Sequence, residues 1–413
     1  MRLLHFADLH LGMENYGTLD TKLGYSTRVR DYLAAFDQVI DHAIEHQVDA
    51  VLFAGDAFKH RDPSPTIQRE FAKRIRRLAA AEIPTVLLVG NHDLPSIDAR
   101  ATPMDIYATL DIPFIYVARD PDVLRLETRG GPLQVVTLPW LSRNRLLDPE
   151  QRRNPDPGAV SRAAAEATSL ILSALVDQLD PEIPAVLLAH LSIEGARLGS
   201  EQSIMLGEDL VLDTDELRVR AFDYVALGHI HQHQLITARP PTVYAGSLER
   251  IDFGEEREDK GFVLVDIQPG PAGERRVEWT FQPVRSRPFV TLRIKAVHED
   301  PMVDVEREIE QRAADLDGAI VRAFIAVPPE REELLRIDEV RRMLLQSGAA
   351  YVAKVVRDVD LQVRPRIELR DHETLDPVAA LEKWLSLRDL TENQRRRILE
   401  AGKALIQAER DGE

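Results

Sequence analysis

Five short apolar runs in this chain end in side chains that can bind metal ions, and this repetition restricts the possible folds more than any other feature. The runs are Leu3–Ala7, Ala50–Ala54, Thr85–Val89, Ala185–Ala189 and Tyr224–Leu227. The side chains that follow them are Asp8 and His10, then Asp56, then Asn91, His92 and Asp93, then His190, then His229 and His231. The chain has 12 histidines, and five lie at these positions, which is hard to obtain by accident. Ligands of α/β sheets bind beyond the carboxyl ends of the strands, so the pattern predicts one polar site.

The alternation of apolar runs with helical patterns predicts an α/β fold for residues 1–282. Helical patterns cover Val29–Gln47, Ser64–Ala81 and Gly158–Leu179. A polar, proline-bearing link then leads into a second segment, residues 288–365, whose order of strand, helix, strand, helix, strand indicates a small α+β domain. Residues 375–413 show apolar positions at helical spacing and predict a pair of helices.

Composition limits the class of protein. The chain has no cysteine, so thiolate metal sites and disulfides are excluded. It has no run of 18 apolar residues, and it begins with an early polar segment, so we expect no membrane span, no secretory signal and a cytoplasmic location. The net charge of −17 argues against a domain that coats DNA without sequence preference, but local basic groups and bound cations can still handle phosphate.

The donor atoms at the strand ends indicate which metals would bind. Imidazole, carboxylate and amide donors favour manganese, iron, magnesium or zinc. Seven candidate ligands are too many for one ion, and Asp56 is suited to bridge two. Two ions about 3.5–4 Å apart can clamp a phosphate and activate a water molecule. The glycines that precede Asp56 and Asn91 would let the chain turn sharply. The spacing therefore predicts a phosphoester hydrolase.

These motifs resemble the calcineurin-like metallophosphoesterase superfamily over about residues 1–250, in the order Asp8-Leu9-His10, Gly55-Asp56, Gly90 to Asp93, His190 and Gly228 to His231. Within that superfamily, the segment Leu4–Gly12 and the stretch from Phe58 to Pro65 are similar to the SbcD branch of DNA double-strand-break repair nucleases. The resemblance implies a β-sandwich flanked by helices, a capping domain that faces DNA, and a helix pair that binds the coiled coil of an SbcC-type, SMC-like ATPase.

The resemblance also implies a role for each matched residue. One manganese ion would be held by Asp8, His10 and His231, and the other by Asn91, His190 and His229, with Asp56 shared. Magnesium or another divalent ion remains an alternative to manganese as the cofactor. His92 would stand near the scissile phosphate and assist departure of the leaving oxygen, and Asp93 would orient His92.

One position departs from the pattern of archaeal relatives, which tend to carry a second phosphate-facing histidine three residues after the bridging aspartate. Lys59 occupies that position here, and His60 follows it. Two readings stay open for Lys59 and His60, namely substrate-binding residues or solvated loop residues.

The resemblance, together with the two C-terminal segments, therefore implies a manganese-dependent DNA exonuclease or endonuclease subunit for repair, recombination and replication, acting as a homodimer within a heterotetramer with its ATPase. Two alternatives stay open. The chain could be another metallophosphoesterase, such as a phosphatase or a cyclic-nucleotide phosphodiesterase, since the metal centre is shared across many substrates. It could also be a non-catalytic scaffold for the ATPase, although no ligand is missing.

Overall fold

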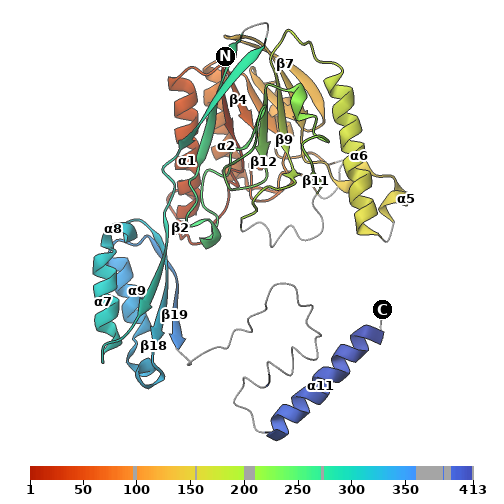
Figure 1. The fold of residues 1–413 in the computed structure, drawn as a ribbon. Coiled ribbons are helices and arrows are strands. Elements are labelled where there is room, and N and C mark those ends of the chain that lie inside the picture. Colours follow the sequence, from red (N-terminus) through yellow and green to blue (C-terminus); the bar gives the residue numbers. More distant parts are fainter. Residues whose placement is uncertain are drawn as a thin grey trace.

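A computed structural model describes residues 1–95, 100–153, 156–199, 210–270, 274–359, 385 and 392–411. Two six-stranded sheets form the larger part of the fold (Figure 1). The first has the order β16-β15-β1-β4-β5-β6, and the second β13-β14-β12-β9-β8-β7. Their bounds are β1 Arg2–Phe6, β4 Ala50–Phe53, β5 Thr85–Leu88, β6 Ile115–Ala118, β7 Asp122–Thr128, β8 Gly131–Leu138, β9 Ala185–His190, β12 Tyr224–Gly228, β13 Gln234–Ala238, β14 Pro241–Tyr244, β15 Gly261–Pro269 and β16 Arg275–Pro283.

The two sheets enclose an apolar core to which both contribute, including Leu52, Val86, Val135 and Leu188. Strands β1, β4, β5 and β6 run parallel, as do β8, β9, β12 and β14. Strands that are buried on both faces have continuous apolar sequences, and for this reason the apolar runs predicted strands at these positions. Because each parallel set ends at one edge, the residues that follow its strands are gathered there.

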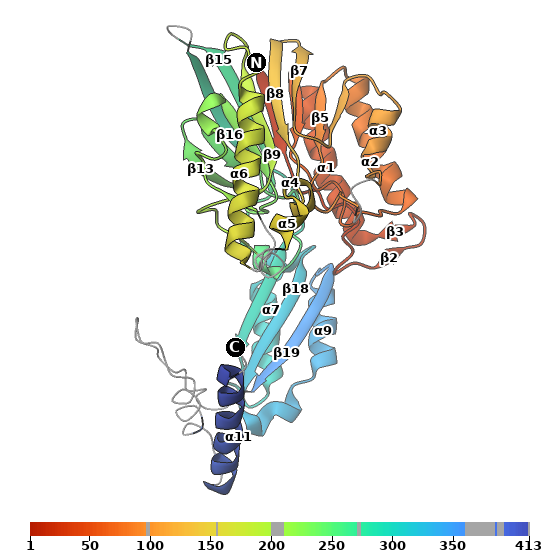
Figure 2. The same cartoon turned by 90° about the vertical axis from the view of Figure 1, so that its right-hand side faces the viewer.

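Helices cover the outer faces of both sheets. Helices α1 (Thr27–Glu45) and α2 (Pro65–Ala80) pack on the first sheet, and α6 (Pro157–Val176) packs on the second (Figure 2). Side-chain caps fix two of the starts: Ser26 accepts a hydrogen bond from the backbone of Arg28, and Ser64 does so from Ile67. The sandwich with flanking helices therefore confirms the predicted fold class.

Helix α6 alone among the described helices has the length and mean apolarity of a membrane span. Its residues Val160, Ala164 and Leu172 are buried against the second sheet. These buried positions form the apolar face that a helix presents to a core, and they account for part of its apolar character.

Shorter elements join these layers. They are β2 Leu19–Asp20, β3 Tyr25–Ser26, α3 Asp105–Thr109, α4 Arg143–Leu146, α5 Pro149–Arg152, β10 Ser192–Ile193, β11 Val211–Leu212, η2 Val219–Ala221 and η3 Phe253–Glu255.

A third sheet follows in the chain, with the order β17-β18-β19 and its own apolar core. Its strands are β17 Phe289–Lys295, β18 Ile320–Val327 and β19 Tyr351–Val359. Its helices are α7 Pro301–Gln311, α8 Ala313–Leu316, η5 Pro329–Leu334 and α9 Ile337–Gln346. The predicted order of strands and helices is present, and all three strands run parallel with the helices as crossovers.

Only part of the predicted helix pair at residues 375–413 can be compared with the structure. Helix α11 spans Glu392–Asp411. The first predicted helix lies, apart from Leu385, outside the described residues.

Candidate metal centre

The predicted ligands lie at the carboxyl ends of strands from both sheets. Asp8 and His10 follow β1, Asp56 follows β4, and Asn91 follows β5 in the first sheet. His190 ends β9, and His229 and His231 follow β12 in the second sheet. Four of these residues have a positive φ: Asp8 (51°), His10 (45°), Asp56 (60°) and His229 (96°). Residues other than glycine adopt this conformation at a cost that functional sites commonly carry.

The candidate ligand atoms converge into three groups, and the group of His10, Asp56 and His92 shares a residue with each of the other two. One group joins Asp8, His10 and His231, and another joins Asp56, His190 and His229, with the candidate atoms of each group within 4.8 Å of one another. The backbone N–H of His229 donates to both carboxylate oxygens of Asp8, at 3.0 and 3.1 Å, so the two sheets are joined at the site.

Asn91 lies beside two histidines of the second sheet. Its Oδ1 is 2.9 Å from His190 Nε2 and 3.2 Å from His229 Nδ1. Asp56 Oδ2 lies 3.4 Å from His190 Nε2 and 3.8 Å from His10 Nε2, so its carboxylate stands between the two groups. The structure thus brings all seven predicted ligands together.

Hydrogen bonds fix which ring nitrogen of two histidines faces the site. His190 donates from Nδ1 to the Ala54 carbonyl oxygen at 2.7 Å, and His231 donates from Nδ1 to Glu255 Oε1 at 2.9 Å. In a neutral ring, Nε2 is then the atom with the free lone pair.

The arrangement fits a bound cation. With Nδ1 of His190 protonated, the lone pair on Nε2 would face two oxygen acceptors, from Asn91 and Asp56. In addition, His231 Nε2 faces His10 Nε2 at 2.9 Å, and both rings are buried. A positive ion among these atoms would remove the repulsion between the facing nitrogen and oxygen lone pairs. The nitrogen and oxygen donor set suits manganese, iron, magnesium or zinc.

The pKa values of the buried groups at the site also indicate that it favours positive charge. Burial is the largest influence on Asp56 and disfavours its ionisation, but the charge and hydrogen bond of His190 together with the charges of His92 and His10 outweigh burial and hold the Asp56 pKa below its usual range. Burial likewise opposes protonation of His190, but the charge and hydrogen bond of Asp56, the charge of Asp8 and the Ala54 carbonyl together outweigh burial and raise the His190 pKa to about 9. Burial and then the neighbouring His231 lower the pKa of His10.

Two glycines have distinct roles at Asp56. Gly55 has a φ of +96°, which fits the predicted sharp turn. Gly90 instead provides close approach, since a Cβ there would lie 2.1 Å from Asp56 Oδ1 and 2.5 Å from its backbone nitrogen.

The predicted catalytic and substrate-binding residues lie next to the predicted ligands. The His92 ring is 4.9 Å from that of His10, and its Nδ1 donates to the Lys59 carbonyl oxygen. Asp93 was expected to orient His92. In the structure, its carboxylate accepts hydrogen bonds from the backbone of Ala57 and Phe58, and also from Gly90. Asp93 thus fixes the loops that carry Asp56 and His92. The Lys59 side chain is half-buried, whereas His60 is exposed.

Sequence reasoning missed three residues at this site. Glu255 contacts the predicted ligand His231, Lys260 is buried against Glu255, and the Trp140 ring lies 4.9 Å from that of His229. Trp140 follows the end of β8, so the strand-end rule that found the ligands would also have found it. Glu255 and Lys260 lie in a charged loop, and the spacing of its residues matches no pattern that would predict a functional site.

Comparison with known proteins identifies the family of this fold. Residues 1–233 match the model of the calcineurin-like phosphoesterases. Three bacterial relatives are each named as the SbcD component of the nuclease SbcCD. The Bacillus subtilis protein is 28% identical over 65% of this chain and 67% of its own length. The Rhodobacter capsulatus protein is 27% identical over 76% of this chain and 76% of its own length. The Escherichia coli K12 protein is 24% identical over 96% of this chain and 96% of its own length.

Proposed function

The chain belongs to the calcineurin-like phosphoesterase family, and on that premise we propose that it is a manganese-dependent DNA nuclease subunit that acts with an SbcC-type ATPase. One observation carries the phosphoesterase chemistry, namely the convergence of seven ligand side chains from five strands of two sheets. The similarity to three components of SbcCD nucleases, one of them over 96% of the chain, supports DNA as the substrate.

Each ion has its own proposed set of ligands. Asp8, His10 and His231 would hold one, and Asn91, His190 and His229 the other, with Asp56 between them. Two divalent ions supply a nucleophile from water and neutralise charge on the phosphate. The chain's own residues fix their separation, because the ligands lie on strand ends joined by hydrogen bonds across the sheets.

His92 is the proposed catalytic residue. Its Nδ1–H is engaged by the Lys59 carbonyl oxygen, so Nε2 is the nitrogen that can carry a proton to the leaving oxygen. Lys59 would contact the substrate phosphate through its side chain, and His60 would lie beside the bound substrate.

The remaining segments carry the proposed assembly. Residues 1–282 would form the nuclease domain, residues 288–365 a capping domain that faces DNA, and residues 375–413 the attachment to the ATPase. We place the homodimer, within a heterotetramer, in the cytoplasm. The ATPase would also supply part of the DNA contact, which reconciles the net charge of −17 with a nucleic-acid substrate.

A comparison of two substrates tests this function. Purified chain with Mn²⁺ should cleave duplex DNA ends and hairpins, and addition of the coiled-coil ATPase with ATP should increase the rate. The control Asp56→Asn should cleave neither DNA nor p-nitrophenyl phosphate. Rapid hydrolysis of p-nitrophenyl phosphate without DNA cleavage, with or without the ATPase, would instead establish a phosphatase. Inactivity on both substrates despite metal binding would favour the scaffold.

A further inference from the structure

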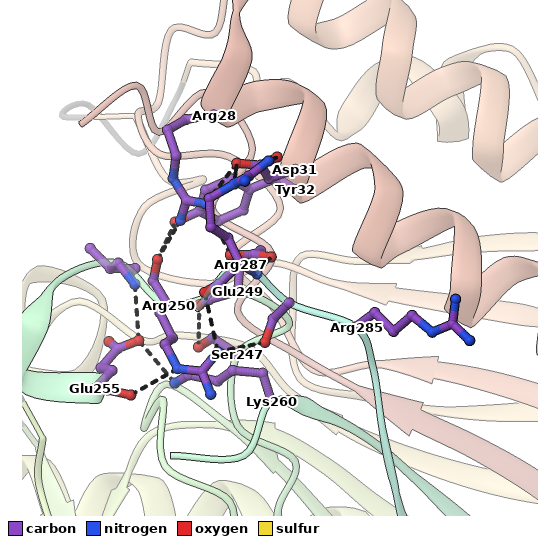
Figure 3. Close-up of polar contacts among 12 residues, drawn as sticks. Arg28, Asp31, Tyr32, Ser247, Glu249, Arg250, Glu255, Lys260, Arg285 and Arg287 are labelled. Carbon is purple, nitrogen blue, oxygen red and sulfur yellow. Dashed lines mark hydrogen bonds and ion pairs between the residues drawn. The ribbon is translucent and has the colours of Figure 1, made fainter. Parts of the chain in front are cut away.

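A buried carboxylate lies directly behind one of the proposed metal ligands. Glu255, the last residue of η3, accepts a hydrogen bond from His231 Nδ1 at 2.9 Å through its Oε1. Both side chains lie in the interior, and Glu255 has no exposed surface. Figure 3 shows Glu255 among the polar groups of this loop.

The second carboxylate oxygen is held as tightly as the first. Glu255 Oε2 accepts from the backbone N–H of Ile251 at 3.0 Å and pairs with Lys260 Nζ at 2.9 Å. Lys260 is also buried, and its ammonium group donates to the His231 carbonyl oxygen at 3.1 Å. Lys260 therefore contacts both the carboxylate and the backbone of the same ligand residue.

The turn that carries Glu255 is fixed from its other side. The Arg250 guanidinium donates to the Glu255 carbonyl oxygen at 3.2 Å and to the Glu258 carbonyl oxygen at 2.6 Å. It also donates to Ser286 Oγ at 2.7 Å in the link before β17. These hydrogen bonds and the ion pair with Lys260 thus leave Glu255 and its turn little freedom to move.

Stability alone is a poor reason for such a pair. Burying a carboxylate and an ammonium group costs several kcal/mol for each ion, and apolar residues of similar volume often serve as well. A carboxylate that engages one ring nitrogen of a histidine does have a known consequence, because it fixes the tautomer and the ring orientation for a metal on the other nitrogen.

We propose that Glu255, held by Lys260, is the positioning residue for His231 and sets the affinity of the ion that Asp8, His10 and His231 share. This proposal rests on the metal centre of the proposed function. Loss of Glu255 should therefore weaken one of two ion sites, while the site of Asn91, His190 and His229 stays unchanged.

Calorimetric titration of the metal-free chain with Mn²⁺ tests the assignment without any cleavage assay. In Glu255→Gln, one of the two sites should lose about 10- to 100-fold in affinity, the range seen when such supporting groups are replaced. The matched control is Glu258→Gln. Glu258 pairs with Lys260 at 2.8 Å, as Glu255 does, but its hydrogen bond goes to Lys260 and not to His231. The Glu258→Gln chain should bind both ions as the wild type does.

The outcomes separate the two proposals. If the wild-type chain binds no Mn²⁺, the proposed function fails and this inference fails with it. If the wild type binds two ions and Glu255→Gln binds both equally well, this inference alone is wrong. Equal losses in Glu255→Gln and Glu258→Gln would also overturn it, because the effect would then belong to the charge around Lys260.

A measurement on the wild type covers the case in which Glu255→Gln does not fold. Nitrogen-15 NMR of histidine-labelled, metal-free chain should show His231 with its proton on Nδ1. A proton on Nε2 alone would overturn the proposal.

Discussion

His92 donates a hydrogen bond from Nδ1 to the carbonyl oxygen of Lys59, 3.0 Å away. The bond joins the end of β5 to the loop after β4, so the ring is oriented by the same loop that carries the proposed bridging ligand Asp56. It leaves Nε2 free to carry a proton to the leaving oxygen, which is the role that we propose for His92.

Replacement of His92 should remove catalysis and spare metal binding. In His92→Ala, we expect DNA cleavage to fall by at least about 100-fold, because general acid catalysis contributes on the order of 10²- to 10⁴-fold. In calorimetry, the His92→Ala chain should still bind as many Mn²⁺ ions as the wild type does. Cleavage at the wild-type rate would show that His92 has no part in the reaction.

Gly90→Ala should disrupt the site through crowding. The new methyl group would meet Asp56 Oδ1 at 2.1 Å, so the carboxylate proposed to bridge both ions must move. We expect weaker Mn²⁺ binding at both sites by calorimetry. The control is Gly24→Ala, at a glycine with φ of +77° and nothing within 4 Å of a Cβ, which should leave Mn²⁺ binding unchanged. If both variants bind Mn²⁺ normally, close approach at Gly90 is not required.

The Lys59 side chain should contribute to DNA binding. Lys59→Ala keeps the carbonyl that orients His92 but removes the cation, so KM for DNA should rise about tenfold, equivalent to about 1.4 kcal/mol, with kcat little changed. Lys59→Arg keeps a positive charge at this position, so its KM for DNA should stay close to the wild-type value. An unchanged KM in Lys59→Ala would leave Lys59 as a solvated loop residue.

Asp304 gives the third sheet a stability that depends on pH. Burial opposes its ionisation, but hydrogen bonds from the His298 backbone and ring and from the Val297 backbone outweigh burial and hold the Asp304 pKa at about 2, against 3.8 for a free side chain. A lowered carboxyl pKa stabilises the fold above about pH 4, and the stabilisation is lost as pH falls through about 2.

In urea unfolding followed by circular dichroism, Asp304→Asn should therefore lose up to about 2 kcal/mol at pH 7. The difference from wild type should shrink between pH 4 and pH 2. Asp315→Asn removes an exposed ion pair with Arg312 and should change stability by less than about 1 kcal/mol. A difference for Asp304→Asn that is constant down to pH 2 would contradict the assignment.

The sequence predicted those parts of the fold and site that depend on the chain's local pattern. Strands such as β4 and β9 are buried on both faces, so their apolar runs and the polar residues after them could be read directly. Strand β16 was missed because its residues alternate between exposed and half-buried, and β7 carries the charged residues Asp122, Arg125 and Glu127.

Contacts that depend on three-dimensional packing were beyond sequence reasoning. Asp93 hydrogen bonds to backbone N–H groups of Ala57 and Phe58, 36 and 35 residues away, and no spacing rule predicts such a partner. The same is true of Glu255, which contacts a ligand 24 residues earlier from within a charged loop. The proposed ligands were predictable because strands of two parallel sets, β1, β4 and β5 in one sheet and β9 and β12 in the other, end at this site.

The number of ions at the centre tests the account most directly. Metal-free chain should bind two Mn²⁺ ions in calorimetry, and its electron paramagnetic resonance spectrum at saturation should show two exchange-coupled ions, because Asp56 lies between both ligand groups. Asp56→Asn should weaken both sites and remove the coupling. A single, uncoupled Mn²⁺ ion per wild-type chain at saturation would contradict the two-metal centre.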